Sequence, residues 1–434
     1  MYSPSGISFY LISLGCSKNQ TESERINSIL SSSGMQYAEK PTDADIIIIN
    51  TCGFIEDAKK ESIEVVFDSL DYKKESTTEF GKKIVVVGCF SQRYYEELKK
   101  EIPEADFIYG IIDDNFQNEL FDRFNIEKTD VKCSTERKPL VSGSAYEYIK
   151  ISDGCSNNCS YCAIPLIRGP VVSFSPERIL KDASEALERG AVELNIIAQD
   201  IAVYSYGKLK LPGLLRKISE LDGDFKIRLL YCHPDNITDE IISEIAQNGK
   251  IVPYIDVPFQ HVSENILKSM NRRGNFGKYS DLAAKLREKI PGLVIRSTFM
   301  VGYPGETEEN FEELLAFLQQ VKLDKVGCFI YSPEEGTASY ELENVEQKVK
   351  KTRYRKLMKL QQKISTEKLH SMIGQKVEVI VEEKVDEANY IGRSVYDAPE
   401  VDGVFYLTGR NITLNTIVTA QITDSVEYDL IGEI

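Results

Sequence analysis

Hydrophobic and polar residues alternate in blocks along the first 125 residues of the chain. Three short runs are almost continuously apolar, as in parallel strands buried on both faces of a sheet, and each is followed by a stretch with helical periodicity. The strands are expected at 8–14, 45–50 and 83–87, and the helices at 22–33, 56–70 and 92–101. Residues 1–125 are therefore predicted to form a doubly wound α/β domain.

A second alternation of strands and helices runs from residue 146 to about residue 340. It follows a predicted linker at 126–145, which contains Cys133, a thiol that we interpret as structural or incidental. Six strands are expected, at 147–151, 193–198, 226–231, 251–257, 294–301 and 325–330. Six β/α units in a row favour a partial (βα)6 barrel, with its chemistry at the carboxyl ends of the strands.

The pattern changes twice more toward the C-terminus. Residues 341–372 are predicted to form one long helix rich in Lys and Arg, which either contacts RNA or pairs with an acidic neighbouring surface. Residues 373–434 show the period of two that is typical of strands, with turn signals between the runs. This last segment is predicted to form a small antiparallel β-barrel of about five strands.

Composition narrows the class of protein. No apolar run reaches the roughly 18 residues that a membrane helix needs, so we expect a soluble protein without a membrane partner. Met1 is not followed by a basic segment of the kind that opens a signal peptide. Nine cysteines in a chain that is not exported indicate a reducing compartment, where thiols bind metals more often than they form disulfides. We therefore expect a cytoplasmic location.

Charge is distributed unevenly. The net charge is −16, and half of it falls after residue 370, where four Lys or Arg stand against twelve Asp or Glu. A segment this acidic should repel phosphates and attract a basic partner.

The strongest chemical signal is the run Cys155-Ser-Asn-Asn-Cys159-Ser-Tyr161-Cys162. Three thiols on a turn of small and polar residues can converge on one metal centre. A cube of four irons held by three cysteines leaves one iron with an open position, where a substrate could bind. A zinc knuckle is the alternative, but no second Cys-x-x-Cys or His pair lies nearby to complete its four ligands.

A second group of thiols follows the three strands of the first domain. Cys16, Cys52 and Cys89 each come at the end of an expected strand, beside Gly or Asn. Carboxyl ends of parallel strands share one edge of the sheet, where such folds bind ligands. Any one of these residues alone would be interpreted as a small buried hydrophobe. Three at equivalent turns favour a shared metal site.

Polar residues also follow the strands of the predicted barrel. Gln199 comes after the second strand, His233 after the third, His261 after the fourth and Glu306 after the fifth, while Arg296 lies within the fifth strand. For the two histidines, a loop side chain with satisfied hydrogen bonds is about as probable as a functional role. Cys232 and Cys328 are better explained by core packing.

The spacing Cys-x3-Cys-x2-Cys resembles that of the radical S-adenosylmethionine (SAM) enzymes, and the whole chain resembles the methylthiotransferases among them. The segments that carry the resemblance are Leu14-Gly15-Cys16 with Lys18-Asn19, Asn50-Thr51-Cys52-Gly53, Gly88-Cys89, Cys155 to Cys162 followed by Arg168-Gly169, and Gly302-x-Pro304-Gly305-Glu306-Thr307. Phe174, Ser17 and Glu22 depart from the usual pattern, which leaves details of SAM and head-domain contacts open.

The resemblance implies two 4Fe-4S clusters and SAM as cofactors. One cluster falls on Cys155, Cys159 and Cys162, where it cleaves SAM to a 5'-deoxyadenosyl radical, and the other on Cys16, Cys52 and Cys89. Candidates for contact with SAM are Tyr161, Gln199, His233, Arg296 and Glu306. The resemblance also implies a radical-SAM barrel and a TRAM-like β-barrel at the C-terminus.

Two branches of the family differ in substrate, one modifying tRNA adenosine and the other a ribosomal protein. Residues 392–403 and the acidic tail resemble the protein-modifying branch, which adds a methylthio group to the β-carbon of an aspartate in ribosomal protein S-twelve. An electron donor such as flavodoxin or ferredoxin is then implied. The tRNA branch is the nearest alternative, and a non-catalytic, metal-stabilised RNA or ribosome binder is a third.

Overall fold

The first domain is built on a five-stranded parallel sheet in the order β2-β1-β3-β4-β5. We describe a computed structural model of the chain, covering residues 1–75, 80–128, 137–140 and 143–434. Cys133 and half of the predicted linker lie outside these residues. The strands are β1 (Ser8–Ser13), β2 (Gln36–Tyr37), β3 (Ile46–Thr51), β4 (Lys83–Gly88) and β5 (Phe107–Ile108).

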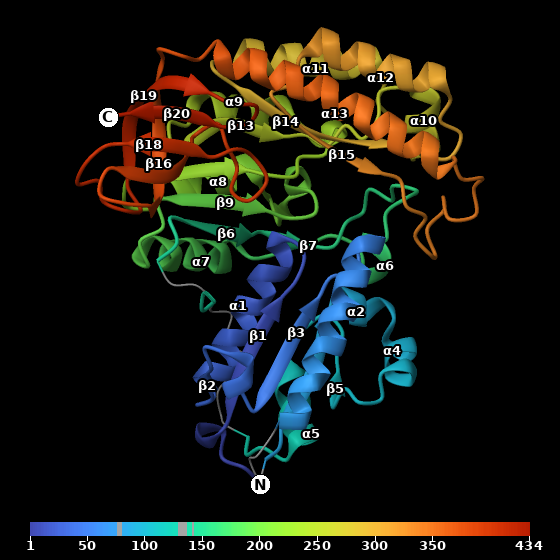
Figure 1. Cartoon of the computed structure of the whole chain (residues 1–434), viewed down its shortest axis with the longest axis vertical. Coiled ribbons are helices and arrows are strands. Elements are labelled where there is room, and N and C mark those ends of the chain that lie inside the picture. Colours follow the sequence, from blue (N-terminus) through green and yellow to red (C-terminus); the bar gives the residue numbers. More distant parts are fainter. Residues whose placement is uncertain (76–79, 129–136, 141–142) are drawn as a thin grey trace.

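The helices of this head domain cover both faces of its sheet (Figure 1). They are α1 (Ser17–Ser32), α2 (Glu56–Asp71), α3 (Cys89–Arg93), α4 (Tyr95–Glu101) and α5 (Phe116–Phe124). The predicted doubly wound fold is confirmed, with three differences. The expected helix at 22–33 begins five residues earlier, directly after Cys16, and the one at 92–101 is broken between α3 and α4. The two-residue edge strands β2 and β5 were not predicted, because so short a strand leaves no periodic pattern.

The second domain is the predicted partial barrel, a six-stranded parallel sheet in the order β15-β14-β13-β12-β9-β6. Its strands are β6 (Tyr146–Lys150), β9 (Glu193–Ile197), β12 (Lys226–Leu229), β13 (Ile251–Asp256), β14 (Val294–Val301) and β15 (Lys325–Ile330). The covering helices are α6 (Ile164–Arg168), α7 (Pro176–Glu188), α8 (Leu211–Ser219), α9 (Asp239–Gln247), α10 (Glu264–Ser269), α11 (Phe276–Lys289) and α12 (Glu308–Val321). Two short antiparallel strand pairs are additions to the prediction: β7 (Ser152–Asp153) with β8 (Val172–Ser173), and β10 (Ser205–Tyr206) with β11 (Leu209–Lys210).

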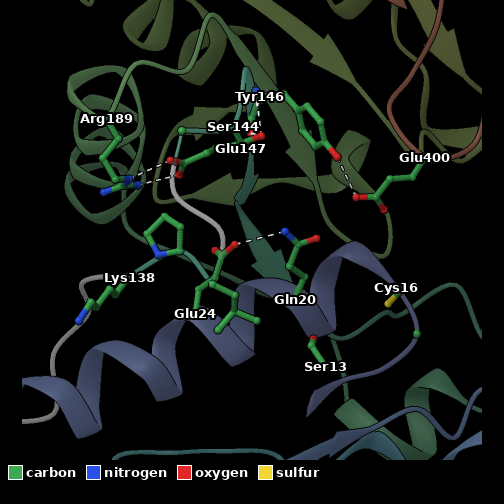
Figure 2. A pocket seen from close by; sticks show the side chains of 14 residues that line it. Ser13, Cys16, Gln20, Glu24, Lys138, Ser144, Tyr146, Glu147, Arg189 and Glu400 are labelled. Carbon is green, nitrogen blue, oxygen red and sulfur yellow. Dashed lines mark hydrogen bonds and ion pairs between the residues drawn. The ribbon is translucent and has the colours of Figure 1, made fainter. Parts of the chain in front are cut away.

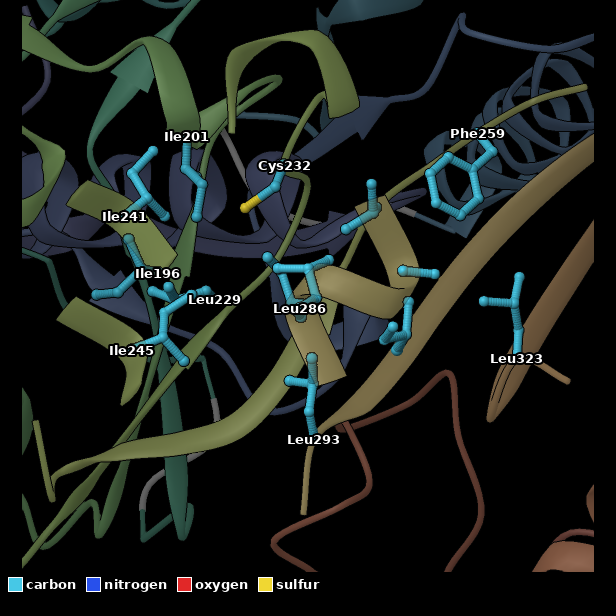
Figure 3. Packing of buried hydrophobic residues seen from close by; sticks show 14 of the residues in the cluster. Ile196, Ile201, Leu229, Cys232, Ile241, Ile245, Phe259, Leu286, Leu293 and Leu323 are labelled. Atoms are coloured by element: carbon cyan, nitrogen blue, oxygen red, sulfur yellow. The ribbon is translucent and has the colours of Figure 1, made fainter. Parts of the chain in front are cut away.

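The main hydrophobic core lies between the convex face of this sheet and its helices. Figure 3 shows part of it, where Ile196 and Leu229 of neighbouring strands pack with Ile241 and Ile245 of α9. Cys232 is fully buried in the same cluster, and Cys328 belongs to it too. The prediction that these two thiols serve core packing agrees with this placement.

The long basic helix, α13 (Gln347–His370), lies along β15 and α12 (Figure 1). Its cations meet carboxylates of the barrel domain: Arg353 pairs with Glu306 and Glu308, and Lys368 pairs with Asp324. Of the two explanations for the basic run, pairing with an acidic neighbouring surface therefore accounts for the cations that face the barrel.

The C-terminal segment closes into a five-stranded barrel in the order β16-β17-β18-β20-β19. Its strands are β16 (Lys376–Lys384), β17 (Asn389–Ser394), β18 (Phe405–Thr408), β19 (Ile417–Ser425) and β20 (Leu430–Glu433). The expectation of purely antiparallel pairing is wrong in one place, since β18 and β20 pair in parallel. Closure of a small barrel depends on which strands lie side by side in the fold, and the local sequence pattern does not encode the direction in which they pair.

This C-terminal barrel packs against the partial barrel on the face opposite the helices. Tyr148, Ile197, Leu230, Val252 and Tyr254 share one hydrophobic cluster with apolar residues of β16 to β20. These positions alternate along their strands with those that face the helices, as the period of a strand requires. Among the described residues, no helix is long and apolar enough to cross a membrane.

Candidate active site

The three barrel thiols lie on the loop between β7 (Ser152–Asp153) and α6. Gly154 has φ +75°, and a Cβ there would lie 2.2 Å from the carbonyl oxygen of Pro170, so only glycine fits. The Cys155 N–H donates to Gly169 at 3.1 Å and the Cys162 N–H donates to the Cys159 carbonyl at 3.1 Å. These bonds close the loop on itself and hold its sulfurs near one another.

A cation and an aromatic ring flank this loop. Arg272, which is 5% exposed, places its Nη1 3.7 Å from the Cys159 sulfur. Tyr161 is packed against the barrel core, and burial raises its pKa, so it remains a neutral phenol. Burial also raises the pKa of Cys162 to about 12. A thiol in this setting becomes a thiolate only when a cation, such as a metal centre, replaces its proton.

The three head-domain thiols lie on loops that meet at the carboxyl ends of β1, β3 and β4. A Cβ on Gly15 would lie 2.7 Å from the Cys52 sulfur, which places the loop of Cys16 against that thiol. Similarly, a Cβ on Gly53 would lie 2.7 Å from the Cα of Phe90, beside Cys89. Cys16 is exposed, whereas Cys52 and Cys89 are buried, and burial raises their pKa to about 11 and about 12.

Asn19 connects these three loops, a role that the sequence did not indicate. Its Nδ2 donates to the carbonyl oxygens of Leu14 at 2.8 Å, Asn50 at 3.2 Å and Thr51 at 3.1 Å. Its Oδ1 lies 3.9 Å from the Cys89 sulfur. Asn19 is 1% exposed, so this side chain fixes the spacing of the three turns from within.

Arg168 joins the two groups of thiols. It ends α6, shortly after Cys162, and places its Nη2 3.0 Å from the sulfur of Cys89 in the head. Its Nη1 contacts Asp153 at 2.9 Å and also pairs with Glu22 of α1. Glu22 is buried. Burial alone would raise its pKa, but Lys150 and Arg168 outweigh burial and lower it, so the carboxylate is charged.

We expect Arg168→Met to lower the free energy of unfolding by about 2 kcal/mol, since removing one partner of a buried ion-pair network leaves the others uncompensated. The loss stays below the cost for an isolated pair because Lys150 still faces Glu22 at 2.8 Å. Urea denaturation under anaerobic conditions measures it. Arg216→Met is the control: that residue pairs with Glu244 at 2.6 Å, but its side chain is 63% exposed, so less than about 1 kcal/mol is expected. Equal losses in the two variants would contradict a special role for Arg168.

Two predicted SAM contacts lie beside the barrel thiols with polar atoms unsatisfied. Gln199 donates from Nε2 to Asp153 at 3.0 Å, and its Oε1 is buried without a hydrogen-bond partner among the described residues. His233 accepts from Asp235 N–H at Nδ1, and burial followed by Arg272 lowers its pKa to about 3. The proton of the neutral ring is therefore on Nε2, a buried donor without a partner in the described chain. One free acceptor and one free donor suit the amino and carboxylate groups of an amino acid such as SAM.

Arg296 and Glu306 lie elsewhere in the barrel. Arg296 contacts Asp256 at 3.4 Å and Asp402 of the C-terminal barrel at 3.3 Å. Glu306 is fully buried, pairs with Arg353 of α13 and accepts from the Gly302 N–H. The charges of both side chains are thus paired with residues outside the two groups of thiols. Their assignment as SAM contacts stays a prediction.

Asp200, which the sequence places at the carboxyl end of the second barrel strand, holds the cysteine loop to its neighbours, a role that was not predicted. Its Oδ2 accepts from Asn157 at 2.9 Å and from Asn236 at 2.7 Å, and its Oδ1 accepts from the His233 N–H at 3.2 Å. One carboxylate therefore sets the positions of the loops after β7, β9 and β12 around the same centre.

A cavity of about 720 Å³ opens between the head, β6 and the C-terminal barrel (Figure 2). Cys16 lies in its wall, and three carboxylates, Glu24, Glu147 and Glu400, line the rest with Tyr146. Glu400 accepts from the Tyr146 hydroxyl at 2.9 Å, and Arg189 pairs with Glu147 at 2.7 Å. Cys16 can therefore be reached from outside through a polar passage of mixed charge, in which Lys138 and Arg189 accompany the three carboxylates.

The donor set fits iron-sulfur clusters better than a single ion. In the part of the chain that is described, no three His, Cys, Asp or Glu side chains are close enough together to hold one metal ion. A cluster of four irons is larger, so its cysteine ligands stand farther apart. All six residues are thiols, the ligand type that such clusters use, and each group has an arginine beside it to offset the negative charge of a bound cluster.

Comparison with known proteins gives matches along the whole chain. Three family models match in succession: Uncharacterized protein family UPF0004 at residues 8–110, Radical SAM superfamily at 149–318 and TRAM domain at 373–434. Curated relatives named ribosomal protein uS12 methylthiotransferase RimO match almost end to end. One from a Thermoanaerobacter species is 43% identical over 98% of this chain and 99% of its own, and one from Alkaliphilus oremlandii is 40% identical over 98% of both. The chain belongs to the RimO family.

Membership in the RimO family confirms several predictions made from the sequence. The chain is a radical SAM methylthiotransferase, and enzymes of this kind use SAM and 4Fe-4S clusters. The α/β head, the radical-SAM barrel and the small β-barrel are the expected architecture. The family name does not identify the residues that hold the cofactors, whereas the positions of the six thiols bear on it.

Solved structures share the fold at low identity. The methyltransferase TsrM from Kitasatospora setae has a TM-score of 0.57 and 13% identity, covering 77% of this chain and 76% of its own. The cobalamin-dependent enzyme OxsB has a TM-score of 0.53 and 11% identity, covering 82% of this chain and 56% of its own. At such identities the likeness concerns the fold alone.

Proposed function

We propose that this enzyme adds a methylthio group to the β-carbon of an aspartate in ribosomal protein uS12, the S-twelve protein of the small subunit. The observation that carries the proposal is the 40–44% identity, over nearly the full length, to relatives named for that reaction. The acidic C-terminal barrel supports it, because a basic protein suits such a surface and a polyanionic tRNA does not.

We assign Cys155, Cys159 and Cys162 to one 4Fe-4S cluster and Cys16, Cys52 and Cys89 to the other. Cleavage of SAM by one electron, which generates a radical able to remove hydrogen from carbon, is the chemistry that the cofactors supply. A radical is needed because the aspartate β-carbon is too weakly acidic for a side-chain base at neutral pH. The protein's part is to bind and orient: Gln199 and His233 offer SAM an acceptor and a donor, and Arg168 holds the two thiol groups side by side.

The partners and place of reaction follow from the substrate. A reducing protein such as flavodoxin or ferredoxin would supply the electron, and the reaction would take place in the cytoplasm with uS12 free or in the small subunit. The basic face of α13 is the feature that favours tRNA, but Arg353 and Lys368 of this helix are already paired with carboxylates of the barrel domain.

The decisive experiment offers both substrates to one enzyme preparation. Anaerobically reconstituted enzyme, SAM and a reductant are incubated with purified uS12 or with tRNA, and mass spectrometry follows each. We expect a methylthio mass gain on a single aspartate of uS12 and none on tRNA. A gain confined to tRNA would overturn the proposal, and no gain on either together with zinc but no iron would favour a non-catalytic binder.

A further inference from the structure

Lys18 of the head domain reaches into the radical-SAM barrel. It is the second residue of α1, two positions after Cys16, and is only 7% exposed. Its Nζ lies 2.9 Å from the ring centroid of Tyr231, which directly follows β12 in the barrel. A cation from the head domain therefore lies at the carboxyl edge of the barrel sheet, two positions along the chain from Cys16.

The charge of Lys18 has no carboxylate partner in the described residues. No ion pair or hydrogen bond engages its ammonium there, whereas the buried Lys150 bonds to Glu22 and Asp153, and the buried Lys350 bonds to Tyr331 and Asn344. A buried ammonium that is not paired costs several kcal/mol, so proteins seldom keep one without a use. The aromatic face of Tyr231 offsets part of this cost.

Asp256, a carboxylate whose pKa is raised by burial and in part lowered again by Arg296 and Lys18, is already engaged by other groups. Its Oδ2 accepts from the Tyr231 N–H at 3.2 Å, and its Oδ1 faces Arg296 at 3.4 Å. Tyr231 itself has φ +67°, a conformation that costs a residue with a bulky side chain about 1–3 kcal/mol. The chain therefore tolerates both a strained backbone and an unpaired cation at one point, a combination that indicates a binding site arranged before its ligand arrives.

Unsatisfied polar atoms gather at the same edge. Gln199 follows β9 and His233 follows β12, and these strands are neighbours in the sheet. Their free atoms, Oε1 and Nε2, lie on the side of the barrel thiols, while Lys18 approaches from the head and from Cys16. The edge thus offers two separate binding positions, one beside His233 and Arg272 and the other beside Lys18 on the head side.

We propose that Lys18 binds the side-chain carboxylate of the acceptor aspartate and so holds its β-carbon between the two thiol groups. This rests on the proposed function, which makes an aspartate the acceptor. An ammonium in a largely enclosed site favours a carboxylate over a neutral amide or a nucleobase. Lys18 is thereby a specificity-determining residue for protein aspartate as the substrate. The carboxylate of SAM is the other possible source of the same chemistry, and the experiment separates the two.

The test compares Lys18→Met and Lys18→Arg with wild-type holoenzyme, using uS12 and a uS12 variant whose acceptor aspartate is replaced by Asn. Lys100→Met is the control, because Lys100 lies in the same domain with 83% of its side chain exposed. Binding of each substrate is measured anaerobically, together with the KM for SAM, iron content and melting temperature.

We expect Lys18→Met to weaken binding of wild-type uS12 by at least about thirtyfold, as when one partner of a buried charge pair is removed. Binding of the Asn variant should change less than about threefold, and Lys18→Arg should recover part of the loss. The KM for SAM and the iron content should stay at the wild-type values. The melting temperature should be equal or higher, since an unpaired buried charge has been removed.

Several results would overturn the inference. Equal weakening with the aspartate and Asn substrates would mean that Lys18 does not contact the carboxylate. A raised KM for SAM with unchanged binding of uS12 would assign Lys18 to SAM, and a lower melting temperature would assign it a structural role. Wild-type enzyme that modifies only tRNA would overturn the proposed function and this inference together, whereas a Lys18 variant that handles uS12 normally would overturn the inference alone.

Discussion

Replacing Cys155, Cys159 and Cys162 with Ala should reduce SAM cleavage by at least about a thousandfold, because the cofactor that these thiols are proposed to hold carries the difficult step. Replacing Cys16, Cys52 and Cys89 should instead leave SAM cleavage measurable and abolish formation of the methylthio product. Each triple variant should retain about half of the iron and sulfide of the wild type. Liquid chromatography of 5'-deoxyadenosine, mass spectrometry of uS12 and iron analysis measure the three quantities.

Cys328→Ala is the matched control for both triple variants. Cys328 is a thiol of the barrel core, 9% exposed, and lies outside both groups. Its loss should cost only packing, about 1 kcal/mol, with iron content and SAM cleavage unchanged. If a triple variant kept the full iron content, or if head-domain variants lost SAM cleavage as completely as barrel variants, the division of six thiols between two clusters would be wrong.

Replacing Glu193 with Ala should lower the free energy of unfolding by about 3–5 kcal/mol. This carboxylate is fully buried beneath the partial barrel, between Arg228 of β12 at 2.6 Å and Arg393 of the C-terminal barrel at 2.5 Å. Arg228 is fully buried, and Arg393 is 3% exposed. Arg228 would be left without a carboxylate, while Arg393 would keep only the partly exposed Glu382 at 2.8 Å, so the contact between the two barrels should open first. Anaerobic urea denaturation followed by circular dichroism should show an early transition that is absent from the wild type.

Glu378→Gln is the control at the same interface. Glu378 of the C-terminal barrel pairs with Lys226 of β12 at 2.8 Å, but its side chain is 47% exposed. Solvent screens such a pair, so its loss should cost less than about 1 kcal/mol and produce no early transition. If Glu193→Ala behaved in the same way, the buried triad would contribute no more to docking of the C-terminal barrel than an exposed pair does.

Much of the architecture could be predicted because it leaves a periodic pattern. The strands β14 and β15 lie at the predicted residues, and β3 shows the pattern of a strand covered on both faces, with Ile at its first four positions and all six positions buried. The head thiols could be grouped because Cys16, Cys52 and Cys89 each follow a strand of one parallel sheet. The departures from the family pattern were visible too, and Glu22 is now seen to pair with Lys150 and Arg168 across the two domains.

Other features could not be predicted because they join residues that are distant along the chain. The early start of α1 was missed since Ser17, Lys18 and Asn19 are polar, yet all three are buried by contact with other parts of the fold. The roles of Asn19 and Asp200 were missed for a similar reason, since each binds loops that follow different strands.

By itself the sequence determined the fold class and the family that the chain resembles, and it predicted which thiols belong together and where the domains divide. These properties depend on residue spacing and on hydrophobic periodicity within single strands, helices and turns, where covalent geometry limits the possible conformations. The tertiary structure alone decided that Arg168 reaches Cys89, 79 positions away, that Glu193 reaches Arg393, 200 positions away, and that Lys18 meets Tyr231. Such contacts arise only when separate elements pack, because a buried charge is stabilised by whatever group the fold brings beside it, and a local pattern does not record that group.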